Sequence, residues 1–236
     1  MAEQRLLEFT RGEIFDDFTG ELSDLRQAFS YFPENVWRYK LAFCLESLGW
    51  EDDLIYLCGI RDDYISMHLN AAKTVEKLIR LIFLLNKRYA PLSPKWLHRE
   101  FRKLPEIAPQ IEGELFRVLE AKDYHEKSDS LNFIYEIILT YMENDDLCNS
   151  YPRQIRPTFS GIRYDIQKSA KDVLKKVSGD LGNKTISGIP IGAVDQWITN
   201  EDILMSADHL NSFSLIYSPK RTERDRFGDL FMVPPL

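Results

Sequence analysis

Apolar side chains recur at helical spacing along most of the first two thirds of the chain. The strongest run spans residues 60–89, where apolar positions follow a period of about 3.6 residues and neither glycine nor proline interrupts them. This run is apolar on all sides from Leu81 to Leu85, so the segment is predicted to be the central and most buried helix. Pro91 and Pro94 then end the helix and force an extended connector.

Shorter helices are predicted on both sides of the central one. A helix over residues 22–32 is followed by Pro33, which suits the first turn of a second helix. Gly49 is typical of the C-terminal end of that second helix. Further amphipathic helices are predicted over residues 96–104, 107–119, 131–142 and 165–177, the last of them rich in lysine.

Strand signals are weak and confined to the two ends of the chain. Residues 6–9 and 12–17 predict short strands near the N-terminus, whereas residues 186–192 hold too many glycines and prolines for a central strand. The prolines at 152 and 157 indicate a loop around the helical body, and the mixed charges over residues 220–226 indicate a mobile tail.

The pattern as a whole predicts a mostly α protein. We expect a multi-helix bundle with a long buried central helix and minor short β-strands near the N-terminus and in the C-terminal third. Residues 1–150 are expected to form the helical core. Residues 151–236 are expected to form a loop-rich extension that packs back on this core within one structural domain.

Composition excludes several classes of protein. The chain of 236 residues carries 14 Phe and 11 Tyr, too many for a disordered protein. Its 30 basic and 37 acidic residues give a net charge of −7, which argues against a general nucleic-acid coat but leaves a local basic face open. No apolar run approaches the roughly 18 residues of a membrane span, and the N-terminus lacks the pattern of a secretory signal. Three widely spaced cysteines predict neither a disulfide framework nor a metal knuckle, so we expect a cytoplasmic protein.

Cations gather in the middle of this acidic chain. Lys73, Lys77, Arg80 and Lys87 share one face of the predicted central helix, and they either bind an anion or form a solvated face in which Glu76 pairs with Arg80. Residues 87–103 hold six cations, two large aromatic residues and two prolines. Such a segment can stack a base and neutralise phosphate, or it can serve as a structural corner whose aromatics pin the connector to the core.

Catalytic motifs are largely missing from the sequence. The adjacent acidic pairs, such as Asp16-Asp17, are interpreted as turns and helix caps, and the chain has no Gly-Ser turn of the kind that precedes a nucleotidyltransferase Asp-x-Asp strand. It also has no nucleophile elbow, zinc-protease motif or phosphate-binding glycine loop. Arg61 and His68, placed on one predicted helix, resemble the Arg-x4-6-His motif of HEPN-type ribonucleases.

Four blocks, in order, resemble a family of uncharacterised proteins with a domain of unknown function. The blocks are residues 12–22, 31–39, 78–105 and 191–204. Members of that family usually carry a nucleotidyltransferase-fold head followed by a helical region, and this chain is similar to the helical region alone. The resemblance implies that the head with its Mg²⁺-binding carboxylates is missing, so the chain is not expected to catalyse nucleotidyl transfer by itself.

The resemblance also directs attention to particular residues and partners. Four cations are expected to bind an anion, two aromatics to stack on it or wall the pocket, and two residues of a glycine-rich loop to reach back over it. These are, in turn, Arg80, Arg88, Lys95 and Arg102; Tyr89 and Trp96; and Asp195 and Gln196. The expected function is a substrate- or nucleotide-binding domain associated with a separate nucleotidyltransferase head protein. We expect no intrinsic cofactor or metal, but a Mg-nucleotide shared with that head; neither a membrane nor a nucleic acid is an expected partner. The alternatives are a HEPN-like ribonuclease using Arg61 and His68, and a structural module that docks a head protein through its apolar surface.

Overall fold

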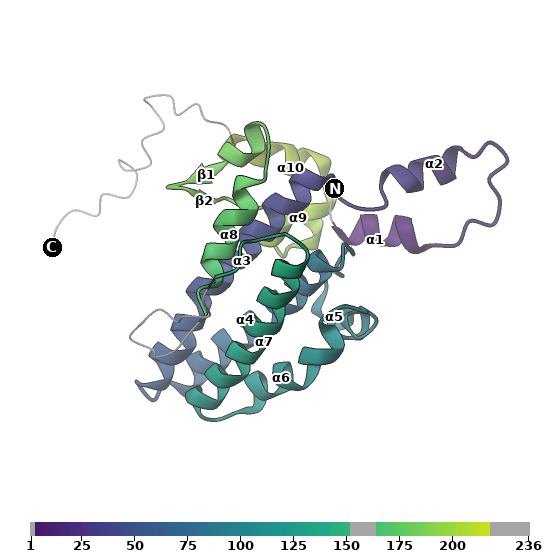
Figure 1. Cartoon of the computed structure of the whole chain (residues 1–236). Coiled ribbons are helices and arrows are strands. Elements are labelled where there is room, and N and C mark those ends of the chain that lie inside the picture. The colour runs from purple at the N-terminus through teal and green to yellow at the C-terminus, as the bar shows by residue number, and fades with distance from the viewer. Residues whose placement is uncertain (1–2, 152–163, 218–236) are drawn as a thin grey trace.

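The computed structural model describes residues 3–151 and 164–217, and this part of the chain is mostly α-helical, as predicted (Figure 1). The longer elements are α1 (Glu3–Arg11), α2 (Glu21–Ala28), α3 (Glu34–Gly59), α4 (Tyr64–Leu85), α5 (Pro94–Phe101), α6 (Ala108–Glu120), α7 (Tyr124–Asn144) and α8 (Ile166–Lys175). Shorter ones follow: η1 (Asp180–Asn183), β1 (Thr185–Ile186), β2 (Ile189–Pro190), η2 (Val194–Gln196), α9 (Glu201–Met205), α10 (Ala207–Ser212) and η3 (Phe213–Tyr217). None of the helices described here is long and apolar enough to cross a membrane.

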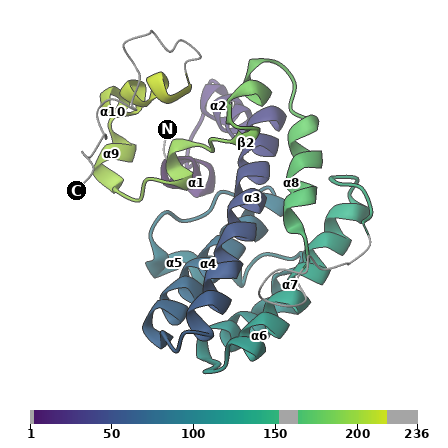
Figure 2. The same ribbon diagram turned by 90° about the vertical axis from the view of Figure 1, so that its left-hand side faces the viewer.

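The antiparallel pair α3 and α4 forms the centre of the molecule. Trp37 near the start of α3 is 2% exposed, and its indole Nε1 donates to the Leu84 carbonyl at 2.8 Å near the end of α4. Helix α8 packs along α3 (Figure 2), while α6 and α7 pack against each other and close the opposite end of the core. The predicted central helix is thus confirmed in α4, whose residues from Leu81 to Leu85 are all buried.

Helix α4 is shorter than the predicted range of 60–89 because both of its ends are set locally. Asp63 caps its N-terminus by accepting a hydrogen bond from the Ser66 amide at 3.1 Å, and the preceding Asp62 has a φ of 57° that no α-helix continues through. At the other end Lys87 takes a φ of 48°. Period alone places a helix, and caps and left-handed residues decide where it stops.

Gly49 does not end its helix, contrary to the prediction. Helix α3 continues for another ten residues to Gly59. A Cβ atom on Gly49 would lie 2.4 Å from the Gln167 side chain on α8, so this glycine allows the two helices to approach closely.

The predicted N-terminal strands are also wrong. Residues 6–9 lie inside α1, which buries Leu6, and residues 12–17 form neither helix nor strand. Three apolar side chains among four residues are compatible with a period of 2 or of 3.6, and no strand of the described residues pairs with this segment. Within the described residues the sheet is the hairpin of β1 and β2, in which Thr185 pairs with Pro190. The predicted loop at residues 152–157 and the tail at 220–226 lie outside the described residues.

A segment comprising the loop over residues 12–20 and α2 projects from the body beside α1 (Figure 1), and we call it the N-terminal arm. No residue of α2 is buried, and Phe15 and Phe18 on the loop are 93% and 96% exposed. Burial of apolar surface therefore contributes little to the stability of the arm in the single chain.

Candidate functional site

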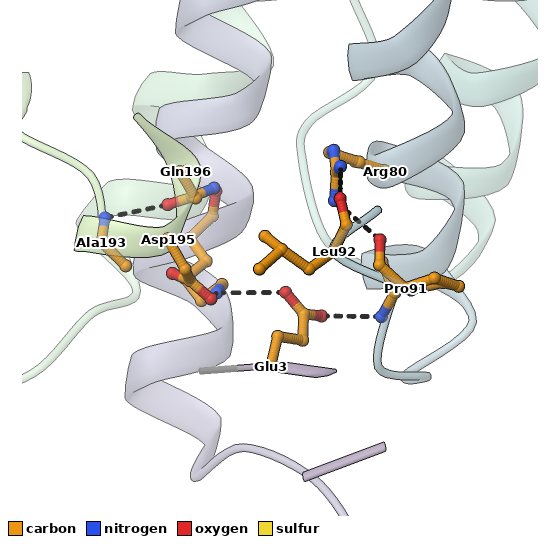
Figure 3. Close-up of polar contacts among 9 residues, drawn as sticks. Glu3, Arg80, Pro91, Leu92, Ala193, Asp195 and Gln196 are labelled. Carbon is orange, nitrogen blue, oxygen red and sulfur yellow. Dashed lines mark hydrogen bonds and ion pairs between the residues drawn. The ribbon is translucent and has the colours of Figure 1, made fainter. Parts of the chain in front are cut away.

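A buried lysine joins α1 and the loop that contains η2 to the central helix pair. Lys40 on α3 is 2% exposed, and its Nζ lies 2.7 Å from Asp195 Oδ2 and 3.5 Å from Glu3 Oε2 (Figure 3). Glu3 comes from α1 and Asp195 from η2, and the ammonium also lies 4.5 Å from the centre of the Phe32 ring. One side chain thus connects α1, α3 and the C-terminal loop.

The charges of this cluster are matched to one another. Burial raises the pKa of Glu3, and the Lys40 ammonium opposes that change. Burial acts to lower the pKa of Lys40, but the carboxylates of Glu3 and Asp195 outweigh it and raise that pKa. The lysine therefore stays charged and is already neutralised by its two partners, which leaves it little capacity to bind an external anion.

The loop that carries Asp195 is held in place by its own contacts. Gln196 Nε2 donates to the Lys40 carbonyl at 2.9 Å, and Gln196 Oε1 accepts from the Ala193 amide at 3.0 Å. Gly192 has a φ of 84°, and a Cβ there would lie 2.6 Å from the Phe43 ring. The glycine thereby lets the loop reach α3 closely enough for Asp195 to meet Lys40.

Arg80, the first of the predicted anion-binding residues, is occupied by internal contacts. Its guanidinium donates to the carbonyl of Leu92 at 2.8 Å and to that of Pro91 at 3.2 Å (Figure 3). It also pairs with Glu76 at 2.9 Å. It lines one cavity together with Asp195 and Gln196, but the cavity measures about 40 Å³. That space holds a water molecule or two and is far too small for a nucleotide.

The other predicted residues lie elsewhere. Tyr89 is 4% exposed, and its hydroxyl donates to the Phe29 carbonyl at 3.0 Å. Arg88 is exposed and makes no side-chain hydrogen bond or ion pair with the described residues. Lys95, Trp96 and Arg102 lie on or just after α5, with the lysine over the Trp96 ring and Arg102 Nε 3.2 Å from Glu112. The eight residues are therefore divided among the small cavity, the core and the surface.

The two residues of the ribonuclease hypothesis do not share a helix, contrary to the prediction. Arg61 is exposed in the turn between α3 and α4, whereas His68 lies on the second turn of α4. The turn at Asp62 and Asp63 interrupts the helix that the spacing assumed. No observation in the described structure favours this alternative.

Metal and disulfide chemistry leave no trace in the described residues. These residues contain no group of three or more histidine, cysteine, aspartate or glutamate side chains placed to hold a metal ion. None of the three cysteines forms a disulfide.

A larger cavity, which the sequence pattern does not locate, opens between α3, α8 and the β1–β2 hairpin. It measures about 750 Å³. Trp50 and Asp53 line it from α3, Lys171 and Lys175 from α8, and Gly182 and Gly188 from the turns that follow. We call it the α3–α8 cavity.

The cations of the α3–α8 cavity are more available than those of the Lys40 cluster. Lys171 is exposed and has no ion pair within the described residues. Lys175 pairs with Asp172 at 3.2 Å, but its side chain is 75% exposed. Trp50 is 60% exposed, so one large aromatic face is open beside these two cations.

Asp172 anchors this wall of the cavity. Burial acts to raise the pKa of its carboxyl group, but hydrogen bonds from Tyr151, Asn149 and Lys175 outweigh it and hold that pKa below its usual value of 3.8. The Tyr151 hydroxyl and the Asn149 side-chain amide donate to Asp172 Oδ2 at 2.5 and 2.7 Å. This carboxylate therefore ties α8 to the segment that follows α7.

We expect the Asp172 contacts to make part of the stability acid-sensitive. Because the folded-state pKa is lower than the unfolded one, the stabilisation is complete above pH 3.8 and is lost as the pH falls through the folded-state pKa. Thermal unfolding followed by circular dichroism from pH 7 downward measures this loss. Asp172→Asn should unfold at a lower temperature than the unmodified protein at pH 7, and its unfolding temperature should fall less on acidification. Parallel pH profiles of the unfolding temperature would contradict this role of the Asp172 carboxylate.

The sequence carried a signal for the α3–α8 cavity that was not sufficient to locate it. The lysine-rich helix and the glycine-rich turn after it are visible in residues 165–183. Trp50, which lines the same cavity, is not indicated by the sequence pattern, because that pattern predicts that the helix ends at Gly49.

A second large cavity, of about 690 Å³, differs in character. It lies between α1, α2, α9 and α10 and is lined mainly by apolar side chains, among them Phe9, Phe29 and Leu210. Arg5 contributes a cation there, but it is already paired with Glu8 at 3.0 Å. This cavity therefore does not suit an anionic ligand.

The fold and site together define an α-helical domain with a polar cavity on one side of its central helix pair. Residues 1–97, which are 97 of the 236, match the model of a family described as a domain of unknown function, DUF4037. The chain is thus similar to that family from α1 to the middle of α5, a range that includes Glu3, Lys40 and Arg80. No curated protein and no solved structure matches the chain.

Proposed function

We propose that this chain is a substrate- or nucleotide-binding helical domain that works with a nucleotidyltransferase and holds no complete catalytic site. The observation that carries the binding function is the α3–α8 cavity, which combines a volume of about 750 Å³ with two accessible cations and an exposed indole. Small-molecule sites commonly have volumes of about 300–1,000 Å³, and the volume of this cavity falls within that range.

The groups of the cavity match the parts of a nucleoside triphosphate. Trp50 offers a face on which a base stacks, and Lys171 and Lys175 offer ammonium groups to phosphate oxygens. The two lysines are four residues apart on α8 and so lie on one side of that helix. Asp53 and Glu46, also in the lining, can accept hydrogen bonds from a base or ribose.

The association with a nucleotidyltransferase rests on the sequence resemblance and not on the cavity. In this proposal a separate cytoplasmic head protein supplies the catalytic carboxylates, and Mg²⁺ arrives with the nucleotide. The buried Lys40 cluster and Arg80 then act as structural ties that hold α1 and the C-terminal loop on the domain.

Calorimetric titration of ATP, with and without Mg²⁺, tests the binding function. Because two charge-assisted contacts are removed, Lys171→Ala with Lys175→Ala should raise the dissociation constant at least about tenfold. Lys168→Ala is the matched control, because this lysine lies on the same helix, is half exposed and does not line the cavity.

The same titration separates the α3–α8 cavity from the residues that the sequence singled out. Arg88→Ala should leave ATP affinity unchanged. Binding that is lost in Arg88→Ala and retained in the double lysine variant would move the site to the connector between α4 and α5. No binding by the unmodified chain would remove the proposal.

A further inference from the structure

The N-terminal arm presents an unusual surface for a single chain. Phe15 and Phe18 at its tip are 93% and 96% exposed, and α2 behind them buries no residue. Two almost fully exposed phenylalanines three positions apart form an apolar patch, and a partner that buries this patch is stabilised by removing it from water. Within one copy of the chain nothing described here covers them.

The same tip is acidic. Five acids and no base lie between residues 12 and 25. Asp17 is used locally, because it accepts hydrogen bonds from Ser23 at the start of α2. Glu13 and Asp16 are exposed and make no hydrogen bond or ion pair with the described residues. The tip thus combines two aromatic side chains with two available carboxylates.

Helix α5 presents the complementary surface. Trp96 is 42% exposed, with Lys95 Nζ 4.8 Å and Arg99 Cζ 5.4 Å from the centre of its ring. Neither cation pairs with a carboxylate in the described part of the chain, although the neighbouring Lys103 and Arg102 do. An exposed indole between two available cations suits an acidic segment that carries aromatic residues.

The arm and α5 lie on the same side of the molecule. Arg11 at the end of α1 pairs with Glu100 on α5 at 3.2 Å, so the base of the arm lies beside that helix. Figure 1 shows the arm and α5 both projecting from the right-hand side of the body. Two complementary patches on one side suit a twofold axis, because the contact between arm and α5 then forms twice, once in each direction.

We propose that two copies of this chain form a twofold dimer in which the arm of each copy docks on α5 of the other. Phe15 and Phe18 pack against Trp96 of the second copy, and Glu13 and Asp16 face its Lys95 and Arg99. This proposal does not depend on nucleotide binding, since none of these residues lines the α3–α8 cavity.

Sedimentation equilibrium of the full chain at micromolar concentrations tests the dimer. The unmodified chain should dimerise, and less tightly as salt is added, because the contact is partly ionic. Phe15→Ser with Phe18→Ser should raise the dimer dissociation constant at least about tenfold. These side chains are exposed in the single chain, so the variant should keep its circular dichroism spectrum and thermal unfolding.

Charge exchange makes the test specific. Lys95→Glu with Arg99→Glu should weaken the dimer, and so should Glu13→Lys with Asp16→Lys. A mixture of these two variants should dimerise again, because one contact is then as in the original and the other has both signs reversed. Lys73→Glu with Lys122→Glu is the control of equal charge change at exposed positions outside both surfaces. A monomer at all concentrations, a dimer insensitive to the arm and α5 variants, or a mixture that stays monomeric would each overturn the proposal.

Discussion

Replacing Lys40 with methionine is expected to lower the free energy of unfolding by about 3–5 kcal/mol. The substitution keeps the volume of the buried side chain but removes the cation shared by Glu3 and Asp195. Two carboxylates then remain in a buried site without the cation that pairs with both, and this is costly because water does not solvate them there. Urea unfolding followed by far-ultraviolet circular dichroism measures the loss.

The matched control for Lys40 is a lysine whose ion pair is exposed. Lys103 pairs with Glu100 at 2.5 Å, and its side chain is 51% exposed. Lys103→Met should therefore cost less than about 1 kcal/mol. Equal losses of unfolding free energy in the two variants would mean that Glu3 and Asp195 become solvated once the Lys40 cation is gone. The cluster would then not hold them in a buried site.

Replacing Trp37 with alanine is expected to lower the free energy of unfolding by about 3–5 kcal/mol. The indole is 2% exposed, donates to the Leu84 carbonyl at 2.8 Å, and carries Lys87 Nζ 4.1 Å above its ring. The substitution opens a cavity where α3 meets the end of α4 and removes the indole hydrogen bond to that carbonyl, which keeps its bond from the Lys87 amide. Urea unfolding again gives the magnitude.

The same substitution at Trp50 separates stability from binding. Trp50 is 60% exposed, so Trp50→Ala should change the free energy of unfolding by less than about 1 kcal/mol. It should nevertheless weaken ATP binding, because the stacking face of the α3–α8 cavity is lost. A large loss of stability at Trp50, or unchanged affinity without it, would contradict the role assigned to this side chain.

The fold was predictable where the sequence pattern is long and uninterrupted. The apolar period through Leu85 identified α4 because burial on all sides leaves few alternatives. The helix end predicted at Gly49 is wrong because a glycine that ends a helix and a glycine that lets a neighbouring helix pack closely give the same sequence signal. Residues 6–9 misled because four residues cannot distinguish the two periods.

The candidate site was less predictable than the fold, for reasons that concern partners. Arg80 was correctly placed on the central helix, but the sequence does not show that carbonyl groups of the connector and Glu76 occupy its guanidinium. Lys40 was overlooked because its carboxylates lie 37 and 155 positions away in the sequence. Long-range pairing of this kind arises from the packed structure and has no local pattern.

The most direct test of the central claim is amide chemical-shift mapping of the isotopically labelled chain during titration with ATP. We predict that the shifted amides cluster around the α3–α8 cavity, at Gly179, Gly182 and Gly188 and along the α8 face that carries Lys171. Shifts confined to the connector around Arg88, Lys95 and Trp96, or no shifts at saturating ATP, would contradict the account.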